Sequence, residues 1–252
     1  MLEILMYCYI FALGSIIGSF LNVLIYRFPK NITVVKGFSH CTDCDTQLKA
    51  KDLVPIFSFL FLKGKCRYCG SHISYRYPLI ETLTALGFTF SFYHFGLSIE
   101  FVINALLLAD LIVITMIDID TMEILNRTNL FLVALAIVSM LFGNVIISDR
   151  IIGMLIISVP LLLIGYLTKG GFGGGDVRLM ACAGFLLGTK SIIVAAFIGI
   201  IAGGIFACFL MAKKKKSGKA QMPFGPFLAV GIYTASLYGP QIANWYLSIL
   251  GR

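Results

Sequence analysis

Eight apolar runs, most of them close to the length of a membrane span, divide this sequence of 252 residues. The hydrocarbon core of a bilayer requires about 20 residues of helix. The runs cover approximately residues 4–26, 78–95, 98–117, 128–147, 151–168, 177–188, 191–212 and 224–249. The run 177–188 is too short to span alone, which predicts either a half-helix inside a bundle or a helix extended into the glycines before it. The sequence therefore predicts an all-α polytopic membrane protein with about eight transmembrane helices, and seven, or six with re-entrant pieces, are the alternatives.

The composition supports this class and excludes others. The chain is 59% hydrophobic and 13% charged, whereas a soluble domain has roughly 45–50% apolar and about 25% charged residues. The first run is long enough to span and no Ala-x-Ala site follows it, so we expect an anchor and not a cleaved signal peptide. The net charge is +8, but the basic residues are not interleaved with aromatic residues as they are on a nucleic-acid surface. No nucleic-acid partner is therefore expected.

The basic residues instead predict an orientation, because Lys and Arg gather in cytoplasmic loops. With the N-terminus outside and eight spans, segments 27–77, 118–127, 169–178 and 213–223 face the cytoplasm and hold 17 of the 20 Lys and Arg residues. The lysine run 213–216 then anchors the end of the seventh span. Attraction to anionic membrane lipid is the alternative role for this run.

One polar segment, residues 27–77, carries Cys41, Cys44, Cys66 and Cys69 as two Cys-x-x-Cys pairs separated by 21 residues. About fifty residues cannot bury a large core and usually need a cross-link. Since disulfides do not persist in the cytoplasm, a metal ion is the expected link. Four thiolates form a closed tetrahedral site, which predicts a structural Zn²⁺ without a catalytic role. Free thiols or a redox pair are the alternatives.

Other polar residues of this segment lie close to the cysteines. Lys65 and Arg67 could offset the negative charge of a zinc-thiolate centre. His40 and His72 flank the two pairs and are either spare metal ligands or surface loop residues. The three remaining cysteines are expected to be small packing residues in apolar runs, namely Cys8, Cys182 and Cys208.

Two carboxylates at the ends of apolar runs are the candidates for chemistry. Asp118 directly follows the run 98–117, and Asp176 follows a glycine-rich stretch that includes Gly173, Gly174 and Gly175. Both are predicted at the cytoplasmic boundary, where the third and sixth helices could bring them together. Two close carboxylates share a proton, as in aspartic proteases: one activates water and the other supports the developing oxyanion. Glycines before Asp176 would let a substrate backbone approach closely.

Alternatives remain for each acid. Asp176 could simply cap the next helix after a flexible connector, since Asp is a frequent N-cap residue. Asp110 lies on roughly the same helix face as Asp118 and could be functional or a neutral packing residue. Asp120 would project from a different face. A transporter that binds an ion with Asp118 and Asp176 is the rival class, although transporters place such sites at mid-membrane in repeated halves.

The order and spacing of these motifs resemble those of the type IV prepilin peptidases, the bifunctional leader peptidase/N-methyltransferases of pilus, type II secretion and competence systems. The resemblance covers nearly the whole chain. The matching motifs are Gly18-Ser-Phe-Leu-Asn-Val-Leu-Ile-Tyr-Arg27-Phe-Pro29, both Cys-x-x-Cys pairs, Gly64-Lys-Cys-Arg, Arg76-Tyr-Pro-Leu-Ile-Glu81, Ile117-Asp-Ile-Asp120, Gly-x-Gly-Asp at Gly173 to Asp176, and Pro223-Phe-Gly-Pro-Phe-Leu-Ala.

The resemblance implies that Asp118 and Asp176 are the catalytic acids of an inner-membrane peptidase. It implies removal of a basic leader from prepilins or pseudopilins on the cytoplasmic face, and methylation of the new N-terminus with S-adenosylmethionine. A peptidase without methyltransferase activity is the alternative. Two positions depart from the family: Ile124-Leu125-Asn126 replaces the usual Leu-Pro-Asp, which puts the local turn in question, and Thr42 replaces a proline.

The domain organisation follows from these assignments. We expect a first transmembrane helix at 1–26, a cytoplasmic zinc segment at 27–77 and a transmembrane peptidase domain at 78–252. The chain has no Rossmann-type glycine motif for the methyl donor, so its binding residues are not identified. The segment 27–77 and its junction at Arg76 to Glu81 is the place to search, and Glu81 pairs either with Arg76 or with the substrate amine.

Overall fold

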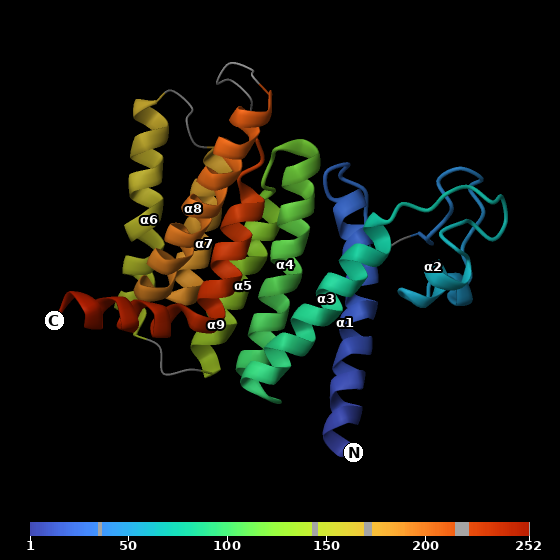
Figure 1. Ribbon diagram of the computed structural model, residues 1–252, viewed down its shortest axis with the longest axis horizontal. Helices are drawn as coiled ribbons and strands as arrows, with labels where there is room; N and C mark the ends of the chain where they lie inside the picture. The colour runs from blue at the N-terminus through green and yellow to red at the C-terminus, as the bar shows by residue number, and fades with distance from the viewer. Residues whose placement is uncertain (35–36, 143–145, 169–172, 215–221, 252) are drawn as a thin grey trace. The chain divides into compact units, whose positions relative to one another are not determined.

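The computed structural model describes residues 1–34, 37–142, 146–168, 173–214 and 222–251 (Figure 1). These residues are helical or irregular, apart from two isolated β-bridges. The chain divides into two compact units, which we call unit 1, Met1–Phe101, and unit 2, Val102–Arg252. Part of the predicted glycine stretch, residues 170–172, and the second half of the lysine run, Lys215 and Lys216, lie outside the described residues.

Unit 1 contains two long helices that pack side by side, α1 (Leu2–Arg27) and α3 (Arg76–Phe95) (Figure 1). Gly14 and Gly18 lie one turn apart on the contact face of α1. A Cβ atom at Gly14 would lie 2.8 Å from the Cα of Ala85, and one at Gly18 would lie 2.7 Å from the Cα of Glu81. The absence of side chains at these two positions therefore allows the helix backbones to approach, as small residues do in membrane helix pairs.

The chain between α1 and α3 carries the four cysteines. It forms the short 3₁₀ helix η1 (Ala50–Asp52) and the short helix α2 (Phe57–Phe61), with turns around both cysteine pairs. Ile56, which precedes α2, has a φ of 63°. This conformation is unusual for a β-branched residue and persists only where the surroundings hold it.

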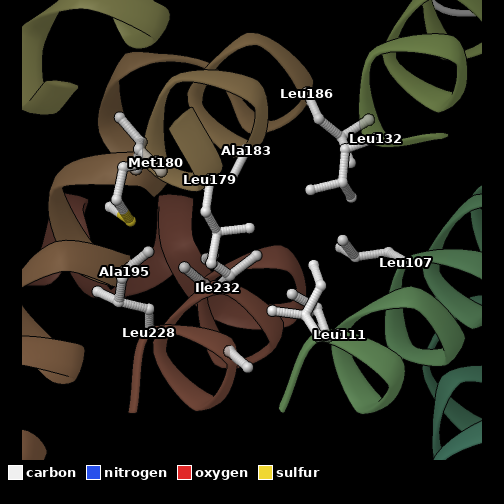
Figure 2. Packing of buried hydrophobic residues seen from close by; sticks show 14 of the residues in the cluster. Leu107, Leu111, Leu132, Leu179, Met180, Ala183, Leu186, Ala195, Leu228 and Ile232 are labelled. Carbon is white, nitrogen blue, oxygen red and sulfur yellow. The ribbon is translucent and has the colours of Figure 1, made fainter. Parts of the chain in front are cut away.

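Unit 2 is a helical bundle built around a short helix. Its helices are α4 (Ile99–Thr121), α5 (Asn126–Phe142), α6 (Ile147–Leu167), α7 (Gly174–Leu187), α8 (Thr189–Lys214) and α9 (Gly225–Leu250). Helix α7 contacts α5, α6, α8 and α9, and Leu179, Met180 and Ala183 on it are fully buried. Figure 2 shows these side chains facing residues of the neighbouring helices. The middle of α7 is thus central to the bundle, whereas Gly174 at its N-terminal end is exposed and Asp176 is half-buried.

Every predicted apolar run corresponds to a helix, with differences at the ends. The run predicted as 128–147 forms α5, which ends at Phe142, and Ile147 instead begins α6. The short run 177–188 extends backward, so that α7 begins at Gly174. With 14 residues and about 1.5 Å per residue, α7 is shorter than the roughly 30 Å core of a bilayer.

Four helices of the described residues are long and apolar enough to cross a membrane: α1, α4, α6 and the part of α8 at Thr189–Ala212. Helix α6 exposes large apolar side chains on much of its surface, including Ile152, Leu155 and Leu162. Soluble proteins rarely expose apolar patches of this extent. The helical, multi-pass membrane class is thus supported, and the count of eight spans stays a prediction.

Candidate active site and metal centre

Asp118 lies in the last turn of α4, at the end of an apolar helix, and only 5% of the residue is exposed. Its Oδ2 atom accepts a hydrogen bond of 2.8 Å from the backbone N–H of Gly225. Gly225 is the first residue of α9, where backbone N–H groups have no partner within the helix. The positive end of the α9 dipole also favours a negative charge at this point. The N-terminus of α9 therefore stabilises an ionised Asp118.

Gly225 is required at this position for steric reasons. A Cβ atom built on it would lie 2.7 Å from Oδ2 of Asp118 and 3.1 Å from its Cγ. In the sequence, Gly225 is part of the motif that begins at Pro223, and the motif alone gives it no role. The glycine between Pro223 and Pro226 at the start of the last apolar run was the signal, because prolines favour the first helical position.

Asp176 lies in the first turn of α7, and the N-cap of that helix is Gly173. The interpretation of Asp176 as the N-cap residue is therefore wrong: it is the third residue of the helix. Its carboxylate accepts a hydrogen bond from the backbone N–H of Gly173. This is the contact that an acidic residue makes at the third position of a capping box, so Asp176 supports the helix start from inside the helix.

The two carboxylates interact electrostatically within unit 2. Asp176 precedes the apolar part of α7, and partial burial together with the negative charge of Asp118 raises the pKa of Asp176 to about 6. A nearby like charge and desolvation both favour the neutral form of a carboxylic acid. Asp118 thus lies against the N-terminus of α9, whereas Asp176 retains its proton more readily than an ordinary Asp.

The three glycines before Asp176 have different surroundings. A Cβ atom at Gly175 would lie 3.0 Å from the Cβ of Ile124, so this glycine allows the segment after α4 to pack against α7. A Cβ atom at Gly173 would lie 3.1 Å from the Asp176 carboxylate. Gly174 is open, with only the Arg178 side chain within 4 Å of such an atom. A role of these glycines in substrate binding stays a prediction.

Arg178 links the glycine stretch to the start of α5. Its Nε donates a hydrogen bond of 3.0 Å to the carbonyl oxygen of Gly174, and its Nη1 donates to Oδ1 of Asn126. Asn126 is the position at which the resembling family carries an aspartate, and its side chain still accepts this bond. Between α4 and α5, Met122 follows the last residue of α4 and has a φ of 55°. The departure at Asn126 therefore leaves an acceptor in place for Arg178, which the sequence did not indicate.

The other two acids of α4 differ from Asp118. Asp120 is exposed, because the helix continues to Thr121 and turns this residue to another face. Asp110 is buried at 8% exposure, and its Oδ2 atom has no hydrogen-bond partner among the described residues.

The four cysteines of unit 1 form one cluster, with all four Sγ atoms within 4.8 Å of one another. The Sγ atoms of Cys41 and Cys69 are 3.8 Å apart. A tetrahedral zinc with Zn–S distances of about 2.3 Å separates its sulfurs by about 3.8 Å, so the residues fit a zinc ion. Backbone hydrogen bonds from Asp43 and Cys44 lower the pKa of the Cys41 thiol to about 6, which favours the thiolate that metal binding requires.

The two Cys-x-x-Cys turns are built alike. In the first, the N–H of Cys41 donates to the carbonyl of Thr46 and the N–H of Asp45 donates to the carbonyl of Cys41. In the second, Cys66 and Gly70 make the same bonds, to Ser71 and to Cys66 respectively. Asp45 and Gly70 occupy equivalent places and both have positive φ, 53° and 75°. The equivalent bonds orient both cysteine pairs toward one centre.

Residues next to the cysteines support the turns and do not join the cluster. His40 and His72 each form a β-bridge through the backbone, with Gln47 and Lys65, and the metal-ligating group contains the cysteines alone. Arg67 forms an ion pair with Asp52, which also accepts a hydrogen bond from the hydroxyl of Tyr68. Arg67 thus holds η1 against the second turn.

Two protein-family models match the chain, one within unit 1 and the other within unit 2. Residues 12–95 match a bacterial peptidase A24 N-terminal domain, and residues 105–208 match the type IV leader peptidase family. The chain is similar to three proteins named prepilin leader peptidase/N-methyltransferase. The protein of Bacillus subtilis (strain 168) is 32% identical over 95% of this chain and 97% of its own length. That of Neisseria gonorrhoeae is 31% identical over 94% and 93%, and that of Aeromonas salmonicida (strain A449) is 30% identical over 96% and 94%. No solved structure gives a significant match.

Proposed function

The chain belongs to the type IV leader peptidase family, and on that premise we propose that it is a membrane aspartic endopeptidase with N-methyltransferase activity. Its substrates are prepilins or pseudopilins, from which it removes the basic leader before methylating the new N-terminal residue. The observation that carries the peptidase activity is the carboxylate pair of unit 2, in which burial together with the charge of Asp118 raises the pKa of Asp176 to about 6.

The two acids take different roles in this proposal. Asp118, which accepts the N–H of Gly225 at the start of α9, is the ionised member and removes a proton from the attacking water. Asp176 is the protonated member and donates a hydrogen bond to the carbonyl oxygen of the scissile peptide as negative charge develops there. The leaving amine then receives a proton from the pair, which restores the starting charge.

The glycine stretch supplies access in this proposal. Gly174 is the glycine with open space at its Cα, so an extended substrate backbone can approach there without a side chain in the way. Gly173 and Gly175 support this opening indirectly, because their nearest neighbours are Asp176 and Ile124. Arg178 holds the stretch to α5 through Gly174 and Asn126.

The proposed membrane arrangement has eight spans in the plasma (inner) membrane, with the N-terminus outside. The charge distribution supports it, since the four segments then facing the cytoplasm hold 17 of the 20 Lys and Arg residues. Asp118 and Asp176 fall at the cytoplasmic ends of their helices, where a leader peptide is accessible. Residues 27–77 form the cytoplasmic zinc segment, in which Zn²⁺ stabilises the fold, and residues 78–252 form the peptidase domain.

The methyltransferase activity uses S-adenosylmethionine, which supplies the methyl group when it is bound. The amine that receives the methyl group is the one that leader cleavage exposes, so the two activities act in sequence on one substrate. Cleavage must come first, because the same nitrogen is part of a peptide bond in the uncleaved prepilin.

A cleavage assay tests this function. Purified full-length protein is incubated with a prepilin, with and without S-adenosylmethionine, and the mass of the product's N-terminal peptide is read. We expect loss of the leader in both reactions and an added methyl group only with the donor. Asp118→Ala and Asp176→Ala should each abolish cleavage while the protein remains in the membrane. Near-normal processing by either variant would refute the carboxylate pair.

A further inference from the structure

Helix α9 contains a proline, Pro240, that separates two parts with different surroundings. The part before it packs along α8: a Cβ atom at Gly239 would lie 2.6 Å from the Oγ of Ser191, near the start of α8. A proline inside a helix removes a backbone hydrogen bond and bends the helix. Figure 1 shows that α9 changes direction, so that its C-terminal part, residues 241–250, runs at a steep angle to the part before it.

The end of α8 beside this bend carries polar residues. Helix α8 is long and apolar enough to cross a membrane. It begins with Thr189 and Lys190, and no charged residue follows before Lys213. A lysine at the end of a membrane helix directs its ammonium to the boundary between lipid and water. Since the ammonium of Lys190 donates a hydrogen bond of 3.0 Å to Oδ1 of Asn244, residues 241–250 start at the depth of this boundary.

The sequence of residues 241–250 separates polar from apolar side chains around the helix. Gln241, Asn244 and Ser248 recur at intervals of three and four residues, so they form one narrow polar stripe. The other positions are apolar or aromatic, namely Ile242, Ala243, Trp245, Tyr246, Leu247, Ile249 and Leu250. Helices that lie in the plane of a membrane surface divide their side chains in this way.

Most of this apolar face is exposed within unit 2. Ile242 and Ala243 pack against the buried cluster. The exposed side chains are Trp245, Tyr246, Leu247, Ile249 and Leu250. Trp and Tyr are enriched where lipid meets water, because the ring lies among apolar groups while its N–H or O–H reaches a polar partner. The composition of the exposed face therefore fits a lipid interface.

A straight α9 would place the same side chains in water. Because Gly239 lies beside Ser191 near the start of α8, the eleven residues from Pro240 to Leu250 would extend about 16 Å beyond it at roughly 1.5 Å per residue. Covering one large apolar side chain contributes about 1.5–3 kcal/mol. The bend at Pro240 keeps the apolar face at the membrane boundary, where lipid can cover it.

We propose that residues 241–250 form an interfacial helix, which lies in the plane of the bilayer between the phospholipid headgroups and the acyl chains. Gln241 and Ser248 face water, and Trp245 faces the lipid. This contact is at the end of α9 opposite Gly225, which donates its N–H to Asp118. The inference does not depend on the proposed peptidase or methyltransferase activity.

The fluorescence of the native protein tests the depth of this helix, because Trp245 is the only tryptophan of the chain. Full-length protein is reconstituted into phosphatidylcholine vesicles whose acyl chains carry bromine, a quencher of tryptophan, near the headgroup or near the chain end. We expect bromine near the headgroup to quench most and aqueous iodide to quench weakly.

A double variant, Trp245→Phe with Phe197→Trp, provides the reference for depth. Phe197 is exposed on α8, and eight residues separate it from Thr189, which corresponds to about 12 Å along the helix. Bromine near the chain end should quench this reporter most.

Cysteine labelling tests which face of the helix meets water. Gln241→Cys and Ser248→Cys place a thiol in the polar stripe, and Tyr246→Cys and Leu250→Cys are the matched variants on the apolar face. A charged maleimide is applied to opened vesicles, and the label is measured on the peptide after Lys219, which contains no native cysteine. Thiols in apolar surroundings stay protonated and unreactive, so we expect the stripe variants to react at least about tenfold faster.

Other arrangements of this helix give different results. Strong quenching of Trp245 by iodide, with equal labelling of all four cysteines, would place the helix in water. Strongest quenching by bromine near the chain end, with slow labelling of Ser248→Cys, would place it across the membrane. Weak quenching by both bromine and iodide would show that a second copy or another protein covers the apolar face. Each of these outcomes would overturn the proposal, and the fluorescence of the native protein requires no variant to fold.

Discussion

The backbone N–H of Gly225 donates a hydrogen bond of 2.8 Å to the buried carboxylate of Asp118. This bond joins the last turn of α4 to the first turn of α9, which are more than a hundred residues apart in the sequence. It fixes the orientation of one acid of the proposed pair and supplies a fixed dipole that favours its ionised form. The same geometry leaves no room for a side chain at position 225.

Gly225→Ala should therefore abolish most leader cleavage without unfolding the protein. The added Cβ would lie 2.7 Å from Oδ2 of Asp118 and displace the carboxylate, and loss of one such hydrogen bond in an active site costs about 10²–10³ in rate. The measurement is kcat/KM for a prepilin peptide. Gly204→Ala is the matched control, because a Cβ on Gly204 meets nothing within 4 Å. Equal activity of both variants would contradict a role for the Gly225 contact.

The pH dependence of cleavage should reflect Asp176. Its pKa of about 6 lies above the ordinary value for Asp of about 3.9, so the protonated form required of the acid is lost as the pH rises through 6. We expect kcat/KM to fall between pH 6 and pH 8. The sign for folding is the same: the folded state binds this proton more tightly, so its contribution to stability is complete below about pH 4 and is lost as the pH passes 6.

Two comparisons make the pH experiment decisive. Asp118→Asn leaves Asp176 buried but removes the neighbouring charge that adds to its raised pKa, so the pH midpoint of the residual cleavage in that variant should shift downward. A rise in kcat/KM between pH 6 and pH 8 in the native protein would assign the acid role to another group.

Replacing Cys41 and Cys44 with Ser should remove the metal and loosen the segment between α1 and α3. Two of the four sulfurs within 4.8 Å of one another would be lost, and a structural zinc site does not persist with two thiolates. Metal analysis should find about one zinc per chain in the native protein and far less in the variant. Limited proteolysis should cut residues 37–75 of the variant much faster.

The control for the metal experiment is Cys208→Ser, a change at an exposed cysteine outside the cluster. It should leave zinc content and proteolysis unchanged. A native protein purified under reducing conditions without stoichiometric zinc would contradict the metal assignment and favour free thiols or a redox pair.

Asn126→Asp should preserve or slightly improve leader cleavage, whereas Asn126→Ala should reduce it several-fold. The side chain of Asn126 accepts a hydrogen bond from Arg178, an aspartate would convert it into an ion pair, and alanine would remove the acceptor. Both groups are exposed, so the gain in stability from the ion pair should stay below about 1 kcal/mol. Loss of cleavage in Asn126→Asp, with normal cleavage in Asn126→Ala, would exclude this link as a support of the glycine stretch.

Local pattern in the sequence was sufficient for the helices. The apolar runs identified the helical segments, because a helix satisfies its own backbone hydrogen bonds without distant partners. Each predicted run corresponds to a helix. Helix ends were less certain: Gly174 and Gly175 carry no apolar signal, yet they begin α7 because Gly173 caps it. The cysteine cluster was also predictable, since two Cys-x-x-Cys pairs in one short polar segment are typical of a shared site.

The sequence by itself determined the class of fold, the four cysteines that cluster and the two candidate acids, because composition and spacing are local properties. Only the tertiary structure decided how the acids differ. The N-terminus of α9 lies against Asp118, whereas the charge of Asp118 acts on Asp176, and this asymmetry depends on helix packing. The surroundings of Glu81 also depend on tertiary structure. Its hydrogen-bond donors Ser19 and Ile56 come from separate elements that folding brings together.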